Sequence, residues 1–145
     1  MHILDYLQAQ QRRIDKSLEH DKLIERLMRA PETINARGMI FYPRVYFNDG
    51  ELEGDIDLVA YSPKSLILVE AKATDTRDLR HIKSLQDEAV VQLISGRNFI
   101  KRFFDIDPSK CYLALSISHG DIQVFEPVEA QQVYANIRKE RCLLE

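Results

Sequence analysis

Three charged residues, Asp57, Glu70 and Lys72, lie in two neighbouring strand-like segments, residues 55–61 (DIDLVAY) and 66–72 (LILVEAK). Two carboxylates can hold Mg²⁺ or Mn²⁺, since such ions keep several waters and need few protein oxygens. A bound ion lowers the pKa of a water and polarises a phosphate. A lysine beside it can orient that water or neutralise developing negative charge. These residue types therefore suit metal-assisted phosphodiester hydrolysis.

Strand geometry decides which side chains can act together. Side chains alternate between the two faces of a strand, so Glu70 and Lys72 share one face and Ala71 points away. The backbone carbonyl of Ala71 is still expected to be a metal ligand. The same alternation groups Asp57 with Asp55 and Val59. It places three residues of that segment on the opposite face: Ile56, Leu58 and Ala60.

The surrounding sequence predicts an α/β sheet with helices on both faces. Apolar residues at three- and four-residue spacings predict helices over residues 4–30, 78–104 and 127–142, with Gly96 a weak point in the second. Aromatic and β-branched residues predict strands over residues 39–47, 55–61, 66–72, 110–116 and 121–125. At 145 residues the chain is expected to form one domain, residues 1–145.

Composition restricts the function without deciding it. The net charge of −3 and pI near 5.8 give no overall basic surface for nucleic acid, although an acidic metal site would itself contribute to this balance. No segment approaches the ~20 apolar residues of a membrane span, and the first residues do not resemble a signal peptide, so a cytoplasmic protein is expected. The cysteines lack zinc-site spacing. Surface positions are expected for the histidines, which are His2, His20, His81 and His119.

The stretch GDIDLVAY followed by LILVEAK resembles the G-(D/E)-I-D … V-E-x-K core of the PD-(D/E)XK nuclease superfamily, over about residues 18–116. The resemblance implies a restriction-endonuclease-like α-β-β-β-α-β core with a mixed central sheet. It implies that Asp57 and Glu70 bind Mg²⁺ or Mn²⁺ and that Lys72 assists hydrolysis. Ile56 stands where the family name has proline. Asp55 matches an acidic residue often found two positions before the metal-binding aspartate.

Further residues are candidates for supporting roles. Some family members add an acidic residue from the first helix and a glutamine from the helix after the E-x-K strand. The corresponding residues are Glu25 and either Gln86 or Gln92. Basic side chains that follow the second strand could contact phosphates or could form an ordinary charged helix face: Arg77, Arg80 and Lys83.

The sequence thus predicts a metal-dependent nuclease acting on DNA, with RNA as the less favoured substrate. The alternative is a catalytically inactive nuclease-like module that binds DNA or protein, in which the charged residues form a structural ion-pair cluster. A chain of this length has little room for a separate specificity domain. A homodimer, or a place in a larger repair or defence complex, is therefore expected.

Overall fold

The computed structural model describes residues 2–11, 18–48, 50, 53–118 and 120–126. The described chain begins with two helices, α1 (Ile3–Ala9) and α2 (Leu18–Arg29), and a 3₁₀ turn, η1 (Pro31–Ile34). Three strands follow: β1 (Ile40–Asn48), β2 (Glu53–Ser62) and β3 (Ser65–Thr74). The long helix α3 (Leu79–Phe104) leads to β4 (Lys110–Ile117) and β5 (Gln123–Phe125).

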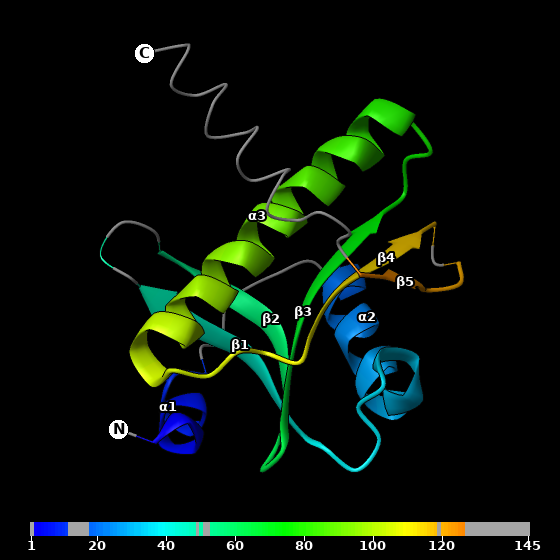
Figure 1. The fold of residues 1–145 in the computed structure, drawn as a ribbon. Coiled ribbons are helices and arrows are strands. Elements are labelled where there is room, and N and C mark those ends of the chain that lie inside the picture. Colours follow the sequence, from blue (N-terminus) through cyan, green and yellow to red (C-terminus); the bar gives the residue numbers. More distant parts are fainter. Residues whose placement is uncertain (1, 12–17, 49, 51–52, 119, 127–145) are drawn as a thin grey trace, which may run out of the picture.

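The strands form one mixed sheet in the order β1-β2-β3-β4-β5 (Figure 1). Only the β3–β4 pair is parallel among the described strands, because α3 makes the crossover between them. Helix α2 covers one face of the sheet, and α1 and α3 cover the other. The predicted α/β sheet with helices on both faces is confirmed.

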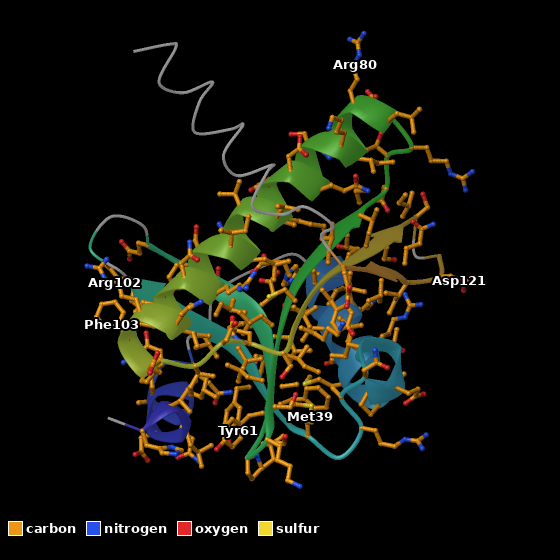
Figure 2. The ribbon with its side chains drawn as sticks, in the orientation of Figure 1. Met39, Tyr61, Arg80, Arg102, Phe103 and Asp121 are labelled. Atoms are coloured by element: carbon orange, nitrogen blue, oxygen red, sulfur yellow. The ribbon has the colours of Figure 1, made fainter. Side chains whose placement is uncertain are left out.

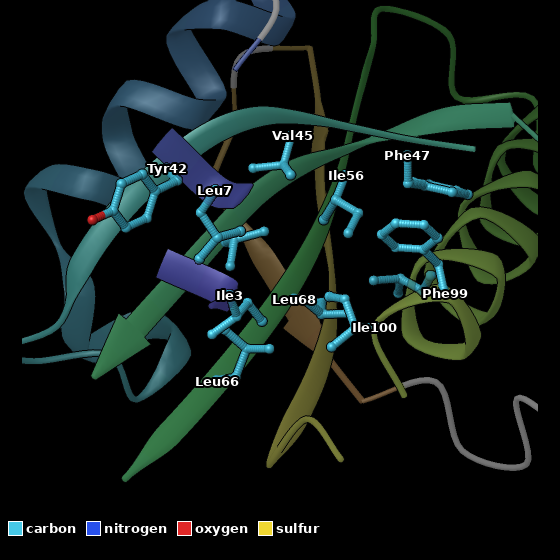
Figure 3. Packing of buried hydrophobic residues seen from close by; sticks show 12 residues of the cluster. Ile3, Leu7, Tyr42, Val45, Phe47, Ile56, Leu66, Leu68, Phe99 and Ile100 are labelled. Carbon is cyan, nitrogen blue, oxygen red and sulfur yellow. The ribbon is translucent and has the colours of Figure 1, made fainter. Parts of the chain in front are cut away.

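The hydrophobic core has two halves, one on each face of the sheet. The α3-side core includes Phe47, Ile56 and Phe99 (Figure 3), and the α2-side core includes Leu27 and Leu58. Burying these side chains on both faces holds β2 and β3 rigidly at the centre of the sheet, where the charged residues lie. No described helix is long and apolar enough to cross a membrane.

Two predicted helices differ from the structure. The expected helix over residues 4–30 is wrong, since α1 ends at Ala9 and the chain then touches β1 through a Gln11–Val45 bridge. Gly96 does not split α3, which runs unbroken from Leu79 to Phe104. The helix predicted over residues 127–142 lies outside the described residues.

Gly96 is required for close packing of α3 on the sheet. A Cβ at this position would lie 2.8 Å from Ile56 Cγ1 and 2.9 Å from Ile56 Cδ1. Alanine gains about 1 kcal/mol of helix propensity over glycine, but overpacking costs about 1–3 kcal/mol. Gly96→Ala should therefore lower the free energy of unfolding by roughly 1 kcal/mol in urea titrations. The exposed Asn98→Ala on the same helix should not lower it, and a gain in stability in Gly96→Ala would contradict the packing argument.

Candidate active site

Asp57 and Glu70 lie where β2 and β3 stop pairing. The ladder between these strands ends at Leu58 and Val69, one residue short of the two acids. Beyond it, the backbone N–H of Asp57 donates to Glu70 Oε1 at 3.2 Å, and the N–H of Ala71 donates to Asp57 Oδ2 at 2.8 Å. Buried N–H groups require an acceptor. The two carboxylates therefore replace the missing ladder bonds and are held between the strands.

The predicted alternation fails in β2 at Asp57. Ile56 and Val59 both belong to the α3-side core although they are three residues apart, whereas Leu58 belongs to the α2-side core. On β1, opposite this point, Arg44 has a left-handed backbone with φ of 58°. The prediction that Ile56 shares a face with Leu58 is therefore wrong, because the two strands are irregular at the same place.

The alternation predicted for β3 is confirmed. Leu66 and Leu68 belong to the α3-side core, and the residues between and after them belong to the α2-side core: Ile67, Val69 and Ala71. Lys72 lies on the same face of β3 as Leu66 and Leu68, since its Nζ lies 3.6 Å from Glu88 Oε1 on α3. The Lys72 side chain is 19% exposed, so its ammonium is held near the surface of the site.

His20 of α2 contacts the candidate site directly. Its Nε2 lies 3.3 Å from Asp57 Oδ2, and the residue is 7% exposed. Its Nδ1 lies 3.7 Å from Asp21 Oδ1, and Asp21 in turn pairs with Arg44. These contacts connect α2 to the irregular part of β1 and β2 and hold Asp57 from the helix side.

The expected surface position is therefore wrong for His20. It lies three, four and seven residues before the buried Leu23, Ile24 and Leu27, so the helical spacing in the sequence placed it on the buried stripe. His2 and His81 are exposed as expected, and His119 is outside the described residues.

Asp57 and Glu70 repel one another when both are ionised. Burial raises the pKa of Glu70 well above its ordinary value, and the charge of Asp57, a hydrogen bond with Asp57 and the charge of Asp55 raise it further. The backbone N–H of Asp57 lowers it. Because Glu70 is 3% exposed and Asp57 1% exposed, two negative charges here require a proton or a cation between them.

This donor set fits a divalent cation. Carboxylate oxygens are ligands that Mg²⁺ and Mn²⁺ prefer, and the repulsion that favours a proton on Glu70 would equally favour a bound cation. Within the described part of the chain, no three side chains of His, Cys, Asp or Glu are arranged as metal ligands. A metal site would therefore depend on Asp57 and Glu70 with non-side-chain ligands, for which the Ala71 carbonyl stays the prediction.

The candidates for supporting roles lie at different distances from the pair. Asp55 is half-buried, and its charge acts on Glu70. The Gln92 side chain covers Gly54, since a Cβ there would lie 2.8 Å from Gln92 Oε1. Gln86 is half-buried on α3. Glu25 is exposed and lies 3.9 Å from Arg29, and no described contact joins it to the carboxylate pair.

The basic residues predicted to contact phosphates are exposed at the start of α3. Figure 2 shows Arg80 projecting from the first turn of α3, away from the sheet. Arg77 precedes the helix and is exposed, and Lys83 Nζ lies 3.7 Å from Asp87 Oδ2. Their accessibility permits contact with a ligand, but the described contacts do not connect them to the carboxylates.

Cys111 has no part in the site. It is partly buried against the α3-side core, and burial raises the pKa of its thiol to about 11. The thiol therefore stays protonated at neutral pH and is a poor nucleophile. Glu88, by contrast, is a neighbour of the site that the sequence did not indicate, because its position follows only from how α3 crosses β3.

The fold is similar to that of a protein from Eubacterium rectale described as a "putative exonuclease". The TM-score is 0.53 at 14% sequence identity, with 85% of this chain and 51% of that chain covered, so this chain spans about half of that protein's length. At this identity the likeness concerns the fold alone.

Two further solved structures match at lower TM-scores, which carry no argument. The first is SSO0001, with a TM-score of 0.37 at 11% identity, and the match covers 99% of this chain and 84% of that one. The second is SPO1766 from Silicibacter pomeroyi, a protein of unknown function, with a TM-score of 0.33 at 14% identity, and the match covers 89% of this chain and 90% of that one. No family model and no curated protein matches the sequence.

Proposed function

We propose that this protein is a divalent-metal-dependent nuclease of the PD-(D/E)XK type that hydrolyses DNA phosphodiester bonds. The observation that carries the proposal is the buried pair Asp57 and Glu70, held between diverging strands with Lys72 two residues further along β3. Burying two like charges side by side is costly for a purely structural element. The likeness of the fold to the Eubacterium rectale protein supports the same class of activity.

In this proposal Asp57, Glu70 and the Ala71 carbonyl hold Mg²⁺ or Mn²⁺. When bound, the ion supplies a water of lowered pKa and polarises the scissile phosphate. His20 and the Ala71 N–H both contact Asp57 Oδ2 and so orient that carboxylate. The Lys72 ammonium neutralises negative charge that develops on the phosphate. The Glu88 carboxylate, 3.6 Å away, keeps the ammonium near the surface of the site.

A second candidate function is a nuclease-like module without catalysis. The observation in its favour is that Lys72 already has a partner in Glu88, and Asp57 already accepts from Ala71, so each charge also has a structural contact. Under this reading the cluster stabilises the fold, and the module binds DNA or protein through other surfaces.

Cleavage assays separate the two functions. The purified chain should cleave DNA in Mg²⁺ or Mn²⁺ and should be inactive in a chelator, with matched single-stranded, duplex and branched DNA tested beside RNA of the same sequence. Faster cleavage of RNA than of DNA would make RNA the proposed substrate. A folded protein without cleavage on any of these substrates, at any metal concentration, would favour the non-catalytic module.

A further inference from the structure

A cavity of about 590 Å³ lies between α2 and the C-terminal ends of β3 and β4. We call it the α2 cavity. Its walls include Lys22 and Arg26 from α2, Thr74 from β3 and Ser116 from β4. Sites for small organic ligands measure about 300–1,000 Å³, so the α2 cavity is large enough for a nucleotide unit.

The α2 cavity adjoins the carboxylate pair. Glu19 in its wall immediately precedes His20, the residue whose Nε2 contacts Asp57. Ala73 in its wall packs on the α2 side of β3, so the cavity lies on the side from which His20 reaches Asp57. Since β2 runs antiparallel and β4 parallel to β3, the cavity and the carboxylate pair lie toward the same end of the sheet. A nucleic-acid strand with one phosphate at Asp57 and Glu70 would therefore pass the cavity with an adjacent nucleotide.

The cavity offers cationic donors that are in place to receive a phosphate. Arg26 Nη1 donates to the Gly120 carbonyl at 3.2 Å, which positions the guanidinium, and its other N–H groups have no acceptor among the described residues. Lys22, one turn earlier on the same helix, is exposed and forms no ion pair with any described residue. The acidic wall residues, Glu19 and Asp75, restrict an anion to the Lys22–Arg26 side of the cavity.

We propose that the α2 cavity binds the nucleotide adjacent to the one attacked, with Lys22 and Arg26 contacting its phosphate. The inference rests on the proposed function for the nature of the ligand, a nucleic-acid strand. It gives the substrate a direction across the protein, over α2 and the ends of β3 and β4. The exposed basic residues at the start of α3 would then make either secondary contacts with the strand or no contact with it.

Binding of a fluorescent single-stranded oligonucleotide in a chelator tests this, because no cleavage then competes. Lys22→Ala with Arg26→Ala should weaken binding roughly tenfold and reduce the slope of log K against log[salt] by about 0.7, which corresponds to one neutralised phosphate on a single strand. The matched control, Arg37→Ala with Lys64→Ala, removes the same charge from exposed positions away from the cavity and should change little. Lys22→Glu alone tests the idea without removing the Arg26 contact to Gly120.

Competition with deoxynucleoside monophosphate and with inorganic phosphate identifies the ligand. The nucleotide should compete in the parent and not in Lys22→Glu, and phosphate should compete poorly. Equal competition by phosphate, or equal losses in the cavity and control variants, would overturn the inference. A stronger effect of Arg77→Ala with Arg80→Ala would also overturn it. Cavity-dependent binding without cleavage in Mg²⁺ would contradict only the proposed function, whereas cleavage with cavity-independent binding would contradict only this inference.

Discussion

Replacing Lys72 by alanine is expected to lower the rate of metal-dependent DNA cleavage by about 10²–10³-fold, the loss seen when one group that stabilises transition-state charge is removed. Lys72 lies on the face of β3 that carries Glu70, two residues away, and its side chain is 19% exposed. The fold should survive, because its partner Glu88 is 58% exposed and can be solvated after the lysine is lost. Far-ultraviolet circular dichroism and urea unfolding check that point.

Lys110→Ala is the matched control for this experiment. Lys110 also pairs with a carboxylate, since its Nζ lies 2.6 Å from Glu126 Oε1, but it is 51% exposed, lies at the start of β4 and has no described contact with the carboxylate pair. The control should therefore cleave at the parental rate. Equal rates for Lys72→Ala and the parent would show that the Lys72–Glu88 pair is structural and that any cleavage does not depend on this lysine.

Replacing Glu70 by glutamine should raise the free energy of unfolding of the metal-free protein at neutral pH. The expected gain is about 1–3 kcal/mol, which is the cost of burying a polar group without compensation. Burial first, and then Asp57 and Asp55, raises the pKa of Glu70 in the folded state. The folded state thus binds a proton more tightly than the unfolded chain, so parental stability falls as pH rises above the ordinary value of 4.5. Glutamine cannot ionise, and its amide oxygen can still accept from the Asp57 N–H.

Urea unfolding in a chelator between mildly acidic and neutral pH measures this difference. The gain in free energy of unfolding of Glu70→Gln over the parent should be smallest at low pH. It should grow with pH until the pH exceeds the raised pKa of Glu70 in the folded parent. Glu25→Gln, an exposed change, should follow the parent at every pH. Adding Mn²⁺ should stabilise the parent and leave Glu70→Gln unchanged, since only binding to the folded state raises stability. A variant that is less stable than the parent at every pH would contradict the strained-pair account.

The strands and the face shared by Glu70 and Lys72 were predictable because β3 alternates regularly between two buried cores. The position of Asp57 was not predictable in the same way. Its turn toward α2 occurs opposite Arg44, which has a φ of 58° although arginine has no local preference for it, and which pairs with Asp21. Such an irregularity is a tertiary effect that a two-residue repeat cannot show.

His20 illustrates the opposite case. Its helical spacing to three buried residues is present in the sequence, but the histidines have no metal-ligand spacing, which is the pattern that would indicate a site. Its partner Asp57 is 37 residues away in the chain, so only the packing of α2 against the sheet brings them together. Glu88 and the α2 cavity likewise arise from the way helices cross strands, which the order of elements does not determine.

The most direct test of the central claim is calorimetric titration of Mn²⁺ into the parent and into Asp57→Asn, with Asp87→Asn as the control on the surface of α3. The parent and the control should bind the ion alike, and Asp57→Asn should bind it at least ~10–100-fold more weakly, as when a group essential to a metal site is removed. The variant should retain the fold, since the asparagine amide oxygen can still accept from Ala71 N–H. Identical isotherms for the parent and Asp57→Asn, or no binding by a folded parent, would contradict a metal site at Asp57 and Glu70.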